Sequence, residues 1–246
     1  MTRPSSSPEL NLSVPTAWEQ LTPAQVETVL DALSGAPNET AGRLIAFCRL
    51  SGITIKRAHG ADTVLVSGGR PYRINTAEFC HAVSEGSEWM TQPPVVPMRP
   101  EKVLGGEALN AEFHYVKFGV FLQAENLWQR FCATEEGRDK LSLLDDLSDI
   151  LFEGITTHSD YSRTAAALWW AGLKNHLSRL FNNLYRPAAG EADGDLLGAM
   201  LAQVRALTGG DVTKEEAVLN VDTWTALAEL DAKAKEAREF SEKYKK

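Results

Sequence analysis

The spacing of apolar residues along this chain changes from helical to strand-like and back again. Between residues 23 and 50 apolar side chains recur every three or four positions, the period of a helix with one buried face. Thr22-Pro23-Ala24-Gln25 combines an N-cap, a proline suited to the first helical position and a capping-box glutamine, which predicts a helix start. A second helix is predicted over residues 39–50, with Gly52 ending it.

A small antiparallel sheet is predicted after these two helices. Residues 53–55, 63–66 and 72–74 form short runs of β-branched and aromatic side chains, and glycine-containing turns separate the runs. This is the pattern of a three-stranded meander. Asn75, followed three residues later by Glu78, predicts the start of a further helix.

Proline and glycine divide the chain. Residues 92–106 contain Pro93, Pro94, Pro97, Pro100 and a Gly-Gly pair, a composition that excludes helix and is typical of an extended linker. The Ser- and Pro-rich residues 1–15 predict a disordered lead. The predicted order is the lead, a helical domain with the small sheet at 16–91, the linker, and a helical bundle at 107–246. The predicted fold class is therefore mainly α, of the α+β type.

All segments after residue 106 show a helical period. The predicted helices cover residues 118–133, 138–152, 160–185, 196–207 and a final stretch that runs to the C-terminus. Thr213 and Glu216 resemble a capping box, which predicts that the final helix starts there. Its apolar seam gives way to Lys, Glu and Arg after Ala234, so its first half is expected to dock and its second half to project.

Charge and cysteine content narrow the class of protein. A net charge of -8 and a pI near 5.2 argue against binding to nucleic-acid phosphates. No run approaches the ~20 apolar residues of a membrane-spanning helix. Cys48, Cys80 and Cys132 are far apart in the sequence and lie among apolar neighbours, which predicts reduced, buried thiols in a cytoplasmic protein.

Two groups of carboxylates are the candidates for chemistry. Glu125 lies in the middle of an apolar helix face, where it could serve as a functional acid or, as we favour, as a paired carboxylate in a structural network. Asp145, Asp149 and Glu153 follow one another at four-residue spacing and could hold a divalent ion. No Glu-x-x-His or similar partner motif accompanies them, which favours a solvated acidic face. Without a catalytic signature, we predict a non-enzyme that needs no metal or cofactor.

Aromatic residues are the candidates for partner binding. Trp224, Phe240 and Tyr244 lie on the predicted final helix, and Trp170 follows Trp169 on an earlier one. Tryptophan is enriched at binding hot spots, and a projecting helix with aromatic side chains suits a groove on a partner. The alternatives are core packing of both tryptophans and a solvated C-terminal tail.

Three stretches of the chain resemble an uncharacterised family found in the tail-gene region of prophages and Mu-like phages of Bacteroidetes. They are PTAWEQLTPAQ at 15–25, FLQAENLW at 121–128 and DTWTALAELDAKAK at 222–235. The resemblance implies a tail assembly chaperone in the cytoplasm of a bacterial host, which would keep the tape-measure protein soluble while tube subunits polymerise around it. The alternatives are a structural tail adaptor or minor virion component and, third, a metal-dependent enzyme that uses the acidic helix face.

Overall fold

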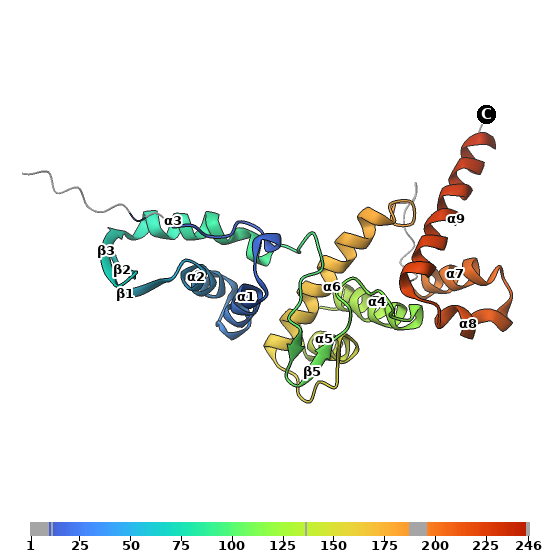
Figure 1. Cartoon of the computed structure of the whole chain (residues 1–246), viewed down its shortest axis with the longest axis horizontal. Helices are drawn as coiled ribbons and strands as arrows, with labels where there is room; N and C mark the ends of the chain where they lie inside the picture. Colours follow the sequence, from blue (N-terminus) through green and yellow to red (C-terminus); the bar gives the residue numbers. More distant parts are fainter. Residues whose placement is uncertain (1–9, 11, 136, 187–195, 245–246) are drawn as a thin grey trace, which may run out of the picture. The chain divides into compact units, whose positions relative to one another are not determined.

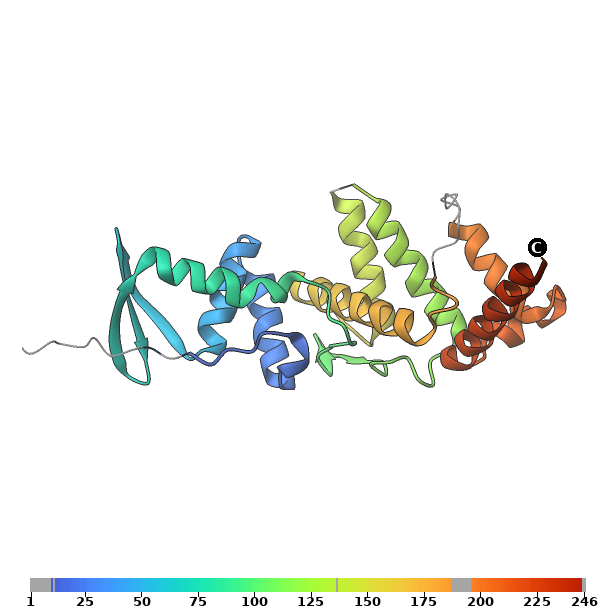
Figure 2. The same cartoon turned by 90° about the horizontal axis from the view of Figure 1, so that it is seen from above.

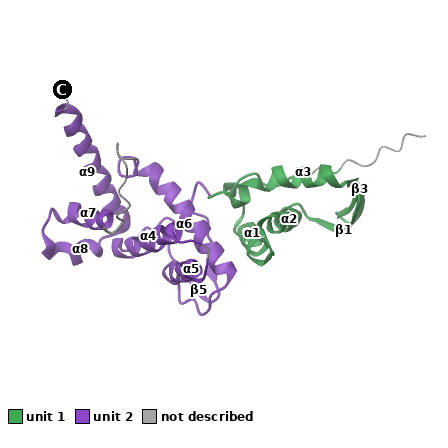
Figure 3. Ribbon diagram, turned by 180° about the vertical axis from the view of Figure 1, so that it is seen from behind, with its two compact units in different colours: residues 1–93 green, residues 94–246 purple. Residues whose placement is uncertain are grey.

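The structure is a computed structural model that describes residues 10, 12–135, 137–186 and 196–244. The chain forms two compact units, Met1–Pro93 and Pro94–Lys246 (Figure 3). Helices dominate both units, and each unit contains one small three-stranded antiparallel sheet (Figure 1). The predicted fold class is thereby confirmed. Most of the predicted lead at 1–15 lies outside the described residues.

The first unit places three helices beside a meander. The helices are α1 (Pro23–Gly35), α2 (Glu39–Leu50) and α3 (Thr76–Ser87), and the strands are β1 (Ile53–His59), β2 (Asp62–Ser67) and β3 (Arg70–Asn75). Thr22 and Gln25 form the predicted capping box in both directions, and Asn75 caps α3 through two backbone N–H groups. The sheet order is β1-β2-β3, and Leu65 at its centre is buried.

Two short 3-10 helices of the first unit each carry a tryptophan, and the two tryptophans are in contact. Trp18 lies in η1 (Trp18–Gln20) and Trp89 in η2 (Glu88–Thr91), and their rings meet edge to face at 5.3 Å. The Trp18 indole donates a hydrogen bond to the Gln92 carbonyl at 3.1 Å. Because this hydrogen bond joins residues far apart in the sequence, it fixes the start and the end of the unit to each other.

The second unit is built around α4 (Phe118–Ala133), which contacts α5 (Arg138–Leu151), α7 (Leu196–Thr208), α8 (Glu215–Leu219) and α9 (Thr223–Tyr244). Figure 2 shows α4 and α5 as an antiparallel pair lying against α6 (Asp160–Leu180). The largest fully buried side chains of this unit are aromatic: Phe113, Phe118, Phe121, Phe152, Trp169 and Trp170.

The proline-rich segment predicted as a linker at 92–106 is folded into the second unit from Pro94 onward. The Asn175 amide donates to the Pro94 carbonyl at 2.8 Å, and Arg99 lies 5.5 Å from the centre of the Trp169 ring. The segment then forms β4 (Lys102–Val103) and β5 (Gly106–Ala108), which pairs with β6 (Phe152–Glu153). The prolines exclude a helix here, as predicted. An extended chain can still pack against a helix, however, and strands of two or three residues are too short to show a period in the sequence.

The C-terminal segment is not the single helix predicted from Thr213. It consists of η3 (Val212–Lys214), α8 and α9, with a break at residues 220–222. The Thr213 hydroxyl bonds to Asp211 at 2.6 Å instead of capping an α-helix. Long-range hydrogen bonds to the chain before α4 explain the break, because Phe118 donates to the Val221 carbonyl and Thr223 donates to the Val116 carbonyl, each at 2.8 Å.

Candidate functional site

Helix α9 is fixed to the rest of the second unit along its first half. Leu227 and Leu230 are buried. Trp224 stacks on His114 with ring centres 4.2 Å apart and meets Phe181 edge to face at 5.5 Å. Its indole donates to the Glu112 carbonyl at 2.6 Å. Trp224 therefore anchors α9 to its own chain, a role that differs from the predicted contact with a partner.

Trp170 is also engaged inside the fold. It has no exposed surface and contacts Phe113 at 5.4 Å between ring centres and Phe121 at 5.7 Å. The neighbouring Trp169 is equally buried and donates its indole N–H to the Ala111 carbonyl. Both tryptophans belong to the core, which was the alternative considered from the sequence, and Trp170 is removed from the candidate partner contacts.

Phe240 and Tyr244 are the predicted contacts that remain at the surface. Their side chains are 65% and 67% exposed, and their rings lie 4.4 Å apart on successive turns of α9. The preceding turn is tethered, since Arg238 donates to the Asn183 carbonyl at 2.9 Å. Beyond that tether the end of α9 extends past α7 and α8 (Figure 1). The structure thus presents an exposed aromatic pair on a helix whose base is held in place.

Asp231 supplies the main polar attachment of α9. It accepts hydrogen bonds from the Asn183 backbone N–H at 2.7 Å, from the Asn183 amide at 2.8 Å and from the Leu184 N–H at 2.9 Å. Burial raises the pKa of Asp231, but these hydrogen bonds and the charge of Arg238 outweigh it and hold the pKa below its ordinary value. The carboxylate therefore attaches α9 to the turn that follows α6 through two backbone N–H groups of that turn.

Replacing Asp231 by alanine is expected to lower the free energy of unfolding by about 1.5 kcal/mol at neutral pH, because two backbone N–H groups lose a charged acceptor. A carboxyl with a depressed folded-state pKa stabilises the fold above its unfolded pKa of about 4, and loses that contribution as the pH falls through the folded value. The difference between wild type and variant should accordingly shrink in acid. Denaturant melts at several pH values measure it, with Glu229→Ala on the same helix as the control.

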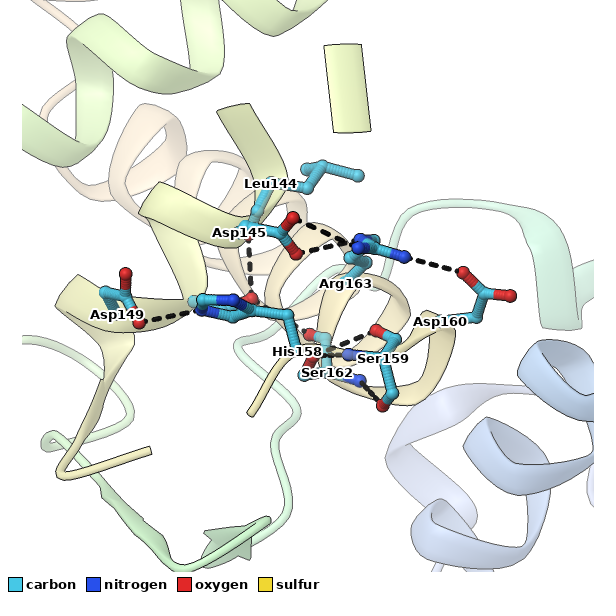
Figure 4. A network of polar contacts seen from close by, with 9 residues as sticks. Leu144, Asp145, Asp149, His158, Ser159, Asp160, Ser162 and Arg163 are labelled. Atoms are coloured by element: carbon cyan, nitrogen blue, oxygen red, sulfur yellow. Dashed lines mark hydrogen bonds and ion pairs between the residues drawn. The ribbon is translucent and has the colours of Figure 1, made fainter. Parts of the chain in front are cut away.

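Asp145 and Asp149 of the acidic row are each paired with a basic side chain of their own chain (Figure 4). Asp145 holds Arg163 in a two-point contact at 2.8 and 3.0 Å, and Arg163 also reaches Asp160 at 2.9 Å. Asp149 lies 2.8 Å from the Nε2 atom of His158. The cluster joins the last turns of α5 to the first turn of α6. Within the described ranges, no group of three or more His, Cys, Asp or Glu residues could hold a metal ion.

Glu125 is one half of an inter-helical ion pair. Its Oε1 atom accepts from Lys174 of α6 at 2.7 Å and from Gln129 at 2.8 Å, and its side chain is only 12% exposed. Lys174 also lies 4.7 Å from the centre of the Tyr185 ring. Burial, followed by the charge of Glu125, raises the pKa of Tyr185 above its ordinary value. This arrangement matches the structural network favoured from the sequence.

The cysteines are less buried than predicted. Cys48 is half-buried, and burial raises the pKa of its thiol to about 11, while Cys80 and Cys132 are exposed. All three are free thiols. Apolar neighbours in the sequence did not predict the burial of these cysteines correctly. Each cysteine lies on a helix, and only one face of that helix is buried.

Sequence reasoning missed the loop at 109–117, which faces the start of α9. Phe113 and Tyr115 adopt left-handed backbone conformations with φ of 65° and 64°, and Tyr115 is 95% exposed. Asp222 accepts the Tyr115 N–H at 2.6 Å and also caps α9 through the Trp224 and Thr225 N–H groups. The sequence offered one signal, since an aspartate before Thr-Trp is a suitable N-cap.

Comparison of the chain with models of protein families, with curated proteins and with solved structures finds no match. In the described part of the chain, no helix has the length and apolar character needed to cross a bilayer.

Proposed function

We propose that this chain is a non-enzymatic phage tail assembly protein, a chaperone that binds the tape-measure protein or another tail protein through the end of α9. The observation that carries the proposal is the exposed pair Phe240 and Tyr244, at 65% and 67% exposure, on a helix tethered up to Arg238. The phage role itself comes from the resemblance of residues 15–25, 121–128 and 222–235 to the tail-region family.

The chemistry of the helix end suits a protein client. Two aromatic side chains on successive turns can enter an apolar groove or cover an apolar segment, and such residues contribute most of the binding energy at interfaces. Charged residues such as Lys235 and Glu239 share this part of the helix and remain exposed. Because the base of α9 is fixed, less conformational freedom is lost when the aromatic pair binds.

Two of the stretches that carry the resemblance form the platform for this helix end. Residues 121–128 lie in α4 and residues 222–235 begin α9, and the two helices contact each other. Helix α8 also packs closely on α4, since a Cβ atom added at Gly119 of α4 would lie 3.2 Å from the Leu219 carbonyl oxygen of α8. The shared stretches thus support the projecting helix, which fits a family role in presenting that helix to another protein.

Co-expression with the tape-measure protein tests the proposal. The wild-type chain is expected to keep the tape-measure protein soluble and to co-purify with it. The Phe240→Ser/Tyr244→Ser double variant should reduce the recovered complex by about tenfold or more, because both aromatic contacts are lost. The control is Leu141→Ser on α5, since Leu141 is also exposed, at 46%, but lies away from α9.

Equal recovery with the double variant and the wild type would remove the end of α9 from the interaction. An insoluble tape-measure protein, with nothing co-purifying, would exclude the chaperone role. Purified virions distinguish the structural alternative, because a tail adaptor or minor virion component stays in the particle whereas a chaperone leaves before maturation.

A further inference from the structure

A second surface of the second unit has the features of a binding site. It lies at the loop 109–117, before α4, and it includes no part of the α9 end discussed above. Tyr115 in this loop is 95% exposed, the highest exposure of any large apolar side chain in the described chain. An aromatic ring left this open gains nothing for the fold by burial. Because single exposed apolar side chains are common, the surroundings of Tyr115 decide whether it belongs to a binding site.

The backbone of the loop is strained where Tyr115 is presented. Phe113 and Tyr115 are both in the left-handed region, with φ of 65° and 64°, which non-glycine residues seldom adopt and which costs free energy at each position. Two strained residues separated by a single histidine turn the chain so that Phe113 enters the core while Tyr115 faces solvent. Phe113 has no exposed surface and contacts both Trp169 and Trp170.

Hydrogen bonds hold the strained conformation in place. The Asn110 side chain accepts from the Glu112 and His114 N–H groups, and the Asp222 carboxylate accepts from the Tyr115 N–H at 2.6 Å. The adjacent Val116 carbonyl accepts from both the backbone and the hydroxyl of Thr223. The loop is therefore fixed from both sides, and the backbone that carries Tyr115 is preorganised.

Tyr115 borders a groove of about 430 Å³ between the loop, α4 and the end of α5. Leu109, Val116, Val120 and Ile150 form its apolar lining. A volume of this size accommodates one or two side chains of a bound peptide and suits an apolar anchor. Tyr115 at the border of the groove can cover such an anchor once it is bound.

One side of the groove, formed by the end of α5 and by β6, carries negative charge. Asp149 of α5 and Glu153 of β6 line it, and Asp149 is in contact with His158. Lys117, which precedes α4, also lines the groove and adds one positive charge. Glu153 lies directly opposite Glu107 across the β5–β6 pair, and Lys102 neutralises Glu107 at 2.8 Å. Within the described residues Glu153 has no basic partner. With Glu107 already paired to Lys102, Glu153 keeps a charge that a cation supplied from outside can pair.

We propose that this groove binds a peptide segment of a partner protein, with an apolar side chain beneath Tyr115 and an adjacent lysine or arginine on Glu153. The strained, preorganised loop supplies the aromatic contact, and Glu153 of β6 supplies the charge that selects a basic residue. This site is independent of Phe240 and Tyr244, so the result of the co-expression experiment has no bearing on it.

A displayed library of short random peptides, panned on the immobilised full-length chain, tests the proposal. Enriched peptides are expected to combine an apolar residue with a neighbouring lysine or arginine. Their affinities are then measured by fluorescence polarisation. Tyr115→Ser should weaken them by about 30-fold or more, as expected for a hot-spot residue. Glu153→Lys should weaken them by about tenfold through charge reversal, and Leu141→Ser, at an exposed residue of α5 that does not line the groove, should leave them unchanged.

A second variant separates binding from folding. Tyr115→Gly removes the ring but suits the left-handed backbone, so its melting temperature should equal or exceed that of the wild type while peptide binding is lost. The proposal is overturned if no peptide is enriched over the blank surface. It is equally overturned if enriched peptides bind wild type and Tyr115→Ser alike, or if they are acidic and bind Glu153→Lys more tightly.

Discussion

Gly172→Ala is expected to destabilise the second unit by about 3 kcal/mol, although alanine is the better helix former by about 1 kcal/mol. A Cβ atom at this position of α6 would lie 2.5 Å from the Val96 carbonyl oxygen and 3.2 Å from the Pro94 Cβ atom. Both neighbours belong to the extended segment packed on α6, and the closest is backbone, which cannot rotate away. The clash therefore outweighs the gain in helix propensity.

Chemical denaturation of the purified chain measures this effect. Gly35→Ala is a matched control, because Gly35 also lies in a helix and an added Cβ atom there meets nothing within 4 Å. The control is expected to be neutral or slightly stabilising for the unit that contains it. A Gly172→Ala variant as stable as the wild type would show that residues 94–100 do not pack on α6, and the interpretation of this segment as a linker would be restored.

Helices α1 and α4 were predictable because their signals are local. Thr22 with Gln25 and the apolar period of residues 118–133 each specify an element without reference to the rest of the chain, and the observed bounds of α1 and α4 agree with them. The prediction of a linker at residues 92–106 was wrong from Pro94 onward, because proline indicates only that a helix is absent. Whether an extended chain packs depends on distant groups, here Gly172 and Asn175, which no local pattern reveals.

The candidate partner-binding residues also divide into those with a local signal in the sequence and those without one. Phe240 and Tyr244 were predicted from the loss of the apolar seam after Ala234, and that loss is a local signal that α9 leaves the core. Trp170 and Trp224 were predicted from residue type alone, and both are occupied by contacts within the fold. The partners of Trp224 are His114, Phe181 and Glu112, far away in the sequence, so their convergence could not be read from the chain.

Lys174→Met is expected to lower the free energy of unfolding by about 3 kcal/mol or more, because it leaves the Glu125 carboxylate buried without its cation. The Glu125 side chain is 12% exposed and that of Lys174 is 20% exposed, so water compensates the lost charge only weakly. Methionine keeps the length of the side chain and can retain contact with the Tyr185 ring through its sulfur atom. The loss therefore reports the unpaired charge more than a cavity. Denaturant melts at neutral pH measure it.

The Glu125→Leu/Lys174→Met double variant completes the argument about Glu125. Replacing both members of a buried ion pair by apolar side chains of similar size is expected to restore stability to within about 1 kcal/mol of the wild type. If Glu125 is structural, the double variant and the wild type should give the same recovery in the co-expression experiment with the tape-measure protein. A stable double variant with a lower recovery would instead assign the Glu125–Lys174 pair a functional role, since no unpaired charge or unfolding would remain to account for the loss.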